Sequence, residues 1–225
     1  MASAGTLVPG GAPFRLGYLG SPEAAARITA AVRATAGDIV VELTEASIAS
    51  PFATLRRGAV DALVTRFHIV EPDLVTGPVL FMEERVLAVG AGHPLAERNT
   101  VDTEDIADHE VFERPDMFPA DVYDQLVPPH SATGRPIRRT QRAATLGEMF
   151  ALIASGVAVH PTISSMRADD AGGIVRYLPI RDLPPSPVTL TWRGADNRPR
   201  LRAFVTAVAR AFAADRSGDA VVAQP

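Results

Sequence analysis

The chain has 225 residues, which is long enough for one large domain or two smaller ones, each with its own core. Hydrophobic residues make up 47% and charged residues 21%, as is typical of a globular protein, and a net charge of −4 gives no indication of a nucleic-acid-binding surface. The absence of cysteine excludes disulfides and thiolate metal sites, and no apolar run has the length of a membrane-spanning helix.

Residues 1–12 are small and carry neither the basic start nor the apolar core of a signal peptide. We therefore expect a cytoplasmic protein with a flexible lead-in at these residues. All 22 basic residues are arginine, which is typical of coding in a GC-rich bacterium.

Strand-like and helical segments alternate along the first part of the chain, the pattern of an α/β protein with mainly parallel pairing. In chain order we expect a strand at 15–19, a helix at 22–35, a strand at 39–43, a short helix ending at Gly58 and a strand at 60–64.

Two polar positions follow predicted strands of this first part. Ser21 is the expected N-cap of the helix that begins at Pro22, and helix starts placed after parallel strands often bind anions. The alternative is that the Ser21 hydroxyl only caps its own helix. Arg66 follows the strand at 60–64 and could bind a carboxylate with two hydrogen bonds, or it could simply be solvated.

The charged step Glu83-Glu84-Arg85 separates two strand-like runs, and we interpret it as a crossing into a second lobe. The clearest helix follows at 146–154, where apolar residues recur with helical spacing and Thr145 and Glu148 form a capping box. A strand at 157–159 then leads into His160. After strands at 174–178 and 188–192, a helix at 199–213 ends the fold.

The second crossing lies near residue 185, so both ends of the chain contribute to the first lobe. We expect lobe I at 13–84 plus 186–214, lobe II at 85–185, and a flexible tail at 215–225.

The motifs of enzymes and metal sites are missing from the sequence. It contains no Gly-x-Ser-x-Gly elbow, phosphate-binding loop or dinucleotide fingerprint, and its five histidines are scattered without metal-ligand spacing. We therefore expect no enzymatic activity, no catalytic residue, no cofactor and no metal. Four arginines between Arg135 and Arg142 could form a nucleic-acid patch, but without interleaved aromatics they favour a solvated strand edge.

Several segments together resemble the effector-binding domain of LysR-type transcriptional regulators. They are FRLGYLGSPEAAARI, VVELTEA, LRRGAVDALVTR, GPVLFMEERVLAVGAGHPLAERNTV, TLGEMFALIASGVAV and VTLTWR, and they cover residues 14 to 213 in order. The resemblance implies a two-lobed fold of the type 2 periplasmic-binding-protein kind, joined by two crossover strands, with a small-molecule inducer in the cleft. The inducer contacts that it implies are Ser21, Ser47, Arg66, Arg114, Thr145 and His160.

The sequence thus predicts an inducer-sensing domain of a LysR-type regulator, which forms a homodimer and binds a polar or anionic effector. The winged helix-turn-helix and linker helix of such regulators are not found in the sequence, so we expect no direct DNA binding by this route. Because the sequence has no long apolar run, we also expect no membrane association. The alternative is a dimerisation or interaction module whose cleft is vestigial and takes no effector.

Overall fold

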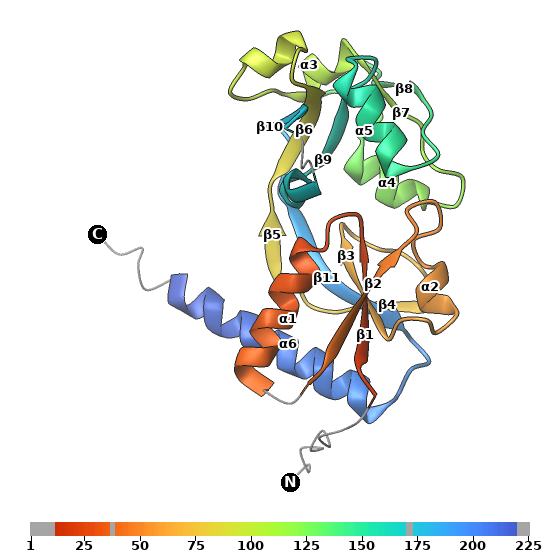
Figure 1. Cartoon of the computed structure of the whole chain (residues 1–225), viewed down its shortest axis with the longest axis vertical. Helices are drawn as coiled ribbons and strands as arrows, with labels where there is room; N and C mark the ends of the chain where they lie inside the picture. The colour runs from red at the N-terminus through yellow and green to blue at the C-terminus, as the bar shows by residue number, and fades with distance from the viewer. Residues whose placement is uncertain (1–11, 37–38, 170–172, 220–225) are drawn as a thin grey trace.

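The computed structural model describes residues 12–36, 39–169 and 173–219, of which 168–169 and 214–219 are described by their backbone alone. Within these residues the chain forms two lobes stacked along the long axis of the molecule (Figure 1). Residues 1–11 of the predicted lead-in at 1–12, and residues 220–225 of the predicted tail, lie outside the described residues. Among the helices described, none is long and apolar enough to cross a membrane.

Lobe I is built on a six-stranded sheet in the order β2-β1-β3-β11-β4, with β5 also paired to β11. Its strands are β1 (Phe14–Leu19), β2 (Val41–Ala46), β3 (Ala62–Arg66), β4 (Leu74–Thr76), β5 (Phe81–Glu83) and β11 (Ser186–Arg193). β1 runs parallel to β2 and β3, whereas β11 returns antiparallel to β3. Residues from both ends of the chain therefore share one sheet.

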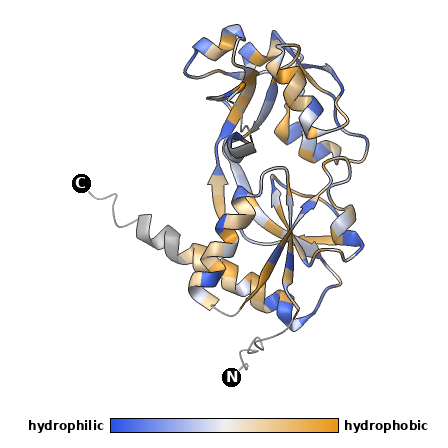
Figure 2. Ribbon diagram, in the orientation of Figure 1, coloured by the Kyte–Doolittle hydropathy of each residue, from blue (hydrophilic) through white to orange (hydrophobic). Residues whose placement is uncertain are grey.

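Helices cover both faces of this sheet because alternate strand residues are apolar on each face. One core packs residues of α1 (Glu23–Ala36) and α6 (Pro199–Asp219) against one face, where Phe14 and Phe204 stack with ring centroids 3.8 Å apart. The short α2 (Ala53–Arg56) covers a second cluster that includes Leu63 of β3. Orange, hydrophobic residues accordingly gather in the strands and on parts of α1 and α6 (Figure 2).

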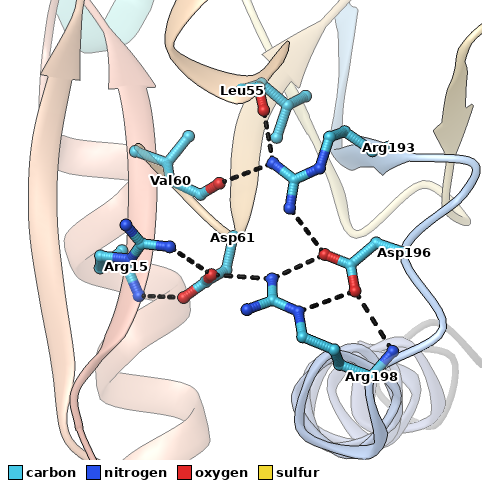
Figure 3. Close-up of polar contacts among 7 residues, drawn as sticks. All are labelled: Arg15, Leu55, Val60, Asp61, Arg193, Asp196 and Arg198. Carbon is cyan, nitrogen blue, oxygen red and sulfur yellow. Dashed lines mark hydrogen bonds and ion pairs between the residues drawn. The ribbon is translucent and has the colours of Figure 1, made fainter. Parts of the chain in front are cut away.

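A buried ionic network ties the C-terminal segment to lobe I (Figure 3). Asp61, 2% exposed, accepts hydrogen bonds from Arg15 at 2.8 Å and Arg198 at 2.9 Å, and Asp196 binds Arg198 and Arg193. Burial alone would raise the pKa of Asp61, but the hydrogen bonds from the two arginines lower it below its usual value. Asp61 is therefore an ionised structural group, and the network lies outside the cavity between the lobes.

Lobe II contains the three-stranded sheet β10-β6-β9 and the pair β7–β8. Its elements are β6 (Arg85–Gly90), α3 (Thr103–Ala107), β7 (Glu110–Phe112), α4 (Ala120–Leu126), β8 (Arg138–Gln141), α5 (Leu146–Ala154), β9 (His160–Ile163) and β10 (Val175–Pro179), with 3-10 turns at Pro94–Glu97 and Ser164–Asp169.

The pairing in lobe II differs from the mainly parallel sheets that the sequence predicted. Only β7 and β8 are parallel, and β6 is antiparallel to both β9 and β10. The reason is that β6 leaves the hinge while β9 and β10 both run back toward it. The predicted arrangement of two α/β lobes, with both ends of the chain in lobe I, is present in the structure.

Some local predictions are confirmed and others are wrong. Helix α5 spans Leu146–Ala154, with Thr145 at its N-cap. The prediction of a strand at 157–159 is wrong, since β9 begins only at His160. Helix α6 continues to Asp219, five residues into the predicted tail. The arginine group near β8 forms ion pairs on the surface, including Arg135 with Asp108 at 2.5 Å and Arg139 with Asp124 at 2.7 Å.

Candidate ligand-binding cleft

A cavity of about 560 Å³ lies between the two lobes, within the size range of small-molecule sites. Lobe I contributes the ends of β1, β2 and β3 with the loops that follow them. Lobe II contributes residues of β7, α4, β9 and the start of α5. Most of the lining is apolar, and its larger side chains are Phe52, Phe67, Phe112, Phe118, Met149, Ile163 and Met166.

Gly20 forms part of the lobe I wall, directly after β1. Its φ of +64° is a conformation that side-chain-bearing residues rarely adopt, and a Cβ there would lie 3.0 Å from the sulfur of Met166. Glycine at this position therefore both permits the turn into α1 and allows β1 to approach Met166.

Arg66 lines the cavity at the end of β3, but its charge is already paired. Its Nε donates to Glu83 Oε2 at 2.6 Å, and its Nη2 donates to Glu83 Oε1 at 3.4 Å and to Ser165 Oγ at 3.1 Å. Both charged side chains are less than 10% exposed. The pair joins the end of β3 to the strand that crosses between lobes, and it leaves Arg66 as a neutralised group.

The two lobes are held together beside Arg66 by a backbone clamp. Gln125 of α4 accepts a hydrogen bond from His68 N at 2.9 Å and donates one to His68 O at 3.0 Å. Phe67, just before this clamp, has a φ of 66°, the one positive value found at a described residue other than glycine. Phe67 also packs with Val122 of α4, so this short segment is a direct contact between the lobes.

Arg85, at the start of β6, is 4% exposed and packs against Phe67, with its guanidinium carbon 5.0 Å from the ring centroid. The guanidinium donates to the carbonyls of Gln125 at 2.9 Å, Thr162 at 3.3 Å, and Leu126. Burial lowers the pKa of Arg85 to about 10, so it remains charged at neutral pH. The hydrogen bonds to Gln125 and Leu126 are directed at the C-terminal end of α4, whose dipole favours a cation.

His160 lines the cavity from lobe II and is 6% exposed. Its Nδ1 atom has no hydrogen-bond partner among the described residues, and its ring meets that of Phe112 edge-on at a centroid distance of 5.5 Å. Burial, with a smaller effect of the Arg85 charge, lowers the pKa of His160 to about 4. The imidazole is therefore neutral at physiological pH and has an unused polar atom.

Thr145 and Glu148 organise the start of α5 at the cavity. Thr145 Oγ1 accepts from Glu148 N at 3.1 Å, and the Glu148 carboxylate accepts from Ala144 N at 2.7 Å. This is close to the predicted capping box, with the carboxylate bound one residue earlier than the usual pattern.

Four of the six predicted contact residues line the cavity: Ser47, Arg66, Thr145 and His160. Ser21 does not line it. Its side chain is 1% exposed, and its hydroxyl accepts from Glu23 N at 3.3 Å, which is the capping role. Arg114 does not line it either, because it turns away to donate to the carbonyls of Pro115, Asp116 and Phe118.

Sequence reasoning missed the apolar character of the cleft and the partner of Arg66. Phe67, Phe112 and Met166 were not predicted as lining residues because their spacing in the sequence is not distinctive. Glu83 was noticed as part of a charged crossing step, and that step was the available signal for a paired arginine. In the part of the chain that the structure describes, no group of histidine, aspartate and glutamate residues could hold a metal ion.

The sequence matches the family profile of the LysR substrate binding domain over residues 13–213. The effector-binding domain of BenM with its effector benzoate is 20% identical, with a TM-score of 0.67 over 90% of this chain and 93% of that one. Full-length CbnR complexed with its target DNA is also 20% identical, with a TM-score of 0.67 over 88% of this chain and 70% of that one. A full-length OxyR variant from Pseudomonas aeruginosa is 21% identical, with a TM-score of 0.62 and coverages of 88% and 69%. A search of curated proteins gave no significant match.

Proposed function

Because the chain belongs to the LysR substrate-binding-domain family, we propose that it senses a small-molecule effector bound in the cavity between its lobes. Members of this family are transcriptional regulators and not enzymes, as the sequence predicted. The observation that carries the proposal is the 560 Å³ cavity, which is mostly apolar and has polar groups at fixed places on both lobes. The BenM domain of the same fold has benzoate as its effector.

An effector in this cavity touches both lobes and therefore favours the arrangement in which they are close together. Ser47 is available from lobe I, and Thr145 and His160 from lobe II. A ligand shifts a conformational equilibrium only by its difference in affinity for the two states, and contact with two lobes at once supplies such a difference. Lobe closure is thus the proposed signal.

The sequence-based prediction of a polar or anionic effector depended on Arg66 and on the helix starts. Pairing of Arg66 with Glu83 supports a polar effector over an anionic one, because the guanidinium charge is already balanced by a carboxylate. We also propose that the domain works in the cytoplasm. We propose further that this chain does not itself bind DNA, which its net charge of −4 supports.

We propose further that it forms a homodimer. Exposed apolar side chains on the outside of both lobes, among them Val40, Val157 and Ile174, support this assignment. Light scattering measures the oligomeric state directly, and a monomer at all concentrations would contradict it.

A thermal-shift screen of metabolites against the 225-residue chain tests the function, with Ser47→Trp as the variant that fills the cleft. Ser47 is exposed at the cavity wall, so the substitution blocks the site without entering a core. Ser155→Trp, exposed at the far end of α5, is the matched control. Effectors should stabilise the wild type and Ser155→Trp but not Ser47→Trp. A dimer that responds to no metabolite would support the interaction module instead.

A further inference from the structure

The positions where this cleft could bind an anion are already occupied by carboxylates of the chain itself. At the end of β3, the Arg66 guanidinium is bound to Glu83 in a pair that is more than 90% buried. An anionic effector would have to displace Glu83 and leave that carboxylate buried without a partner, which is strongly unfavourable. Arg66 therefore acts as part of the cleft wall and not as a receptor for negative charge.

The start of α5 is occupied in the same way. The Glu148 carboxylate lies at the first turn and accepts from Ala144 N, so it already balances the positive end of the helix dipole. At the start of α1, Glu23 lies in the first turn and its N–H is bound to the Ser21 hydroxyl. Neither helix start offers an uncompensated positive field to a ligand.

The remaining charges near the cleft also disfavour an anion. Glu45 and Glu113 both line the cavity, and Glu113 is paired with the exposed Arg142 at 2.6 Å. Arg85 is a buried cation close to the cavity, but it does not line it, and its donors are directed at three backbone carbonyls. Arg85 is thus held behind the cavity wall, and Arg66, which lines the cavity, is paired with Glu83.

Of the described residues that line the cavity, only His160 has a buried side-chain nitrogen or oxygen without a hydrogen-bond partner, its Nδ1. A buried polar atom without a partner costs free energy, so the imidazole is the group of the lining that gains most from a polar ligand. Each ring nitrogen of a neutral imidazole either accepts or donates a hydrogen bond, depending on the tautomer. A hydroxyl or an amide can serve both tautomers because each can donate and accept, whereas a carboxylate can only accept.

We propose that the effector is uncharged, with an apolar or aromatic body in the Phe112, Phe118 and Met166 part of the cleft and one hydroxyl or amide group bound to the His160 imidazole. This inference rests on the proposed function and names the chemical class of ligand that the same cavity takes. It sets this cleft apart from that of the BenM domain, whose effector is the anion benzoate.

Two pairs of probes with matched shapes test the proposal on the 225-residue chain at pH 7.5, with affinities measured by ligand-observed NMR. Benzamide and benzoate differ in charge, and phenol and toluene differ in the hydroxyl. We expect benzamide to bind at least tenfold more tightly than benzoate, and phenol about fivefold more tightly than toluene, which is the usual effect of one hydrogen bond.

Two variants assign these differences to residues. His160→Phe should abolish the preference for phenol over toluene, while His130→Phe, an exposed histidine in the same lobe, should keep it. Glu83→Gln leaves Arg66 with an unpaired charge and should raise the affinity for benzoate at least fivefold. Circular dichroism checks that each variant is folded, and the probe pairs on the wild type give a result even if a variant is not.

Benzoate binding as tightly as benzamide to the wild type would overturn the proposal and leave effector sensing intact. A preference for phenol that survives in folded His160→Phe would overturn the assignment to His160. Failure of all four probes to bind at millimolar concentration would overturn this proposal, whereas the proposed function stands or falls with the metabolite screen on the wild type and Ser47→Trp.

Discussion

Removal of Glu83 should destabilise the protein far more than removal of a surface charge. Glu83→Leu keeps the approximate volume of the side chain but leaves the Arg66 guanidinium, 7% exposed, without its carboxylate. The hydrogen bond from Arg66 to Ser165 at 3.1 Å remains and compensates only part of the loss. Breaking one side of a buried ion pair typically costs about 3–5 kcal/mol.

Urea denaturation followed by circular dichroism measures the effect, because the midpoint and slope together give the free energy of unfolding. For a chain of this length the same loss lowers Tm by roughly 6–20 °C. The double variant Arg66→Met/Glu83→Leu replaces both charges with apolar groups and should recover most of the stability. Arg142→Leu breaks the exposed pair with Glu113 as a control and should cost about 1 kcal/mol or less.

A loss below about 1 kcal/mol in Glu83→Leu would refute the reasoning. It would mean that Arg66 reaches water when Glu83 is removed, and so that its charge is available to ligands. A double variant no more stable than Glu83→Leu would show that the cost comes from packing at the hinge and not from the unpaired charge.

Three other predictions follow from contacts around the cleft. Gln125→Ala removes both hydrogen bonds to the His68 backbone, so the lobes should separate more readily and small-angle X-ray scattering should give a larger radius of gyration; an unchanged radius would show that the clamp does not hold them. His160 has a pKa of about 4 when folded and an ordinary value of 6.5 when unfolded, so the unfolded state binds more protons between these values and stability should rise by about 3 kcal/mol from pH 4 to 6.5. His160→Phe should lack that share of the pH dependence in urea titrations, and an identical pH profile would contradict the assignment. Ser21→Ala should lose about 1 kcal/mol of stability from the missing cap without weakening the probes, since Ser21 does not line the cavity; weaker probe binding would restore it as a contact.

Local signals in the sequence were sufficient for many elements of the fold. The cap at Thr145 and the apolar spacing of Leu146 to Ala154 depend on neighbouring residues alone, and helix α5 has the predicted bounds. The direction of β9 and β10 could not be predicted in the same way. It is set by pairing with β6, some 70 to 90 residues earlier in the chain, and a short apolar strand has the same appearance in either direction.

The same distinction applies to the site. The family resemblance implied Ser47, Thr145 and His160 as contacts, and each lines the cavity. The charged step at Glu83 was a signal in the sequence, but its pairing with Arg66 in particular depends on how β3 and the crossing strand meet in space. Ser21 was attractive as a ligand contact for the same features that make it a good cap, and the capping geometry alone accounts for them.

The location of the ligand is the central claim, and the methionine methyl groups report on it most directly. In a 13C-methyl NMR titration with benzamide and with benzoate, Met149 and Met166 lie on the cavity wall, whereas Met82 and Met117 are exposed and outside it. The account predicts saturable shifts of Met149 and Met166 with no change at Met82 and Met117. Shifts confined to Met82 or Met117 would place the ligand elsewhere and contradict a site between the lobes.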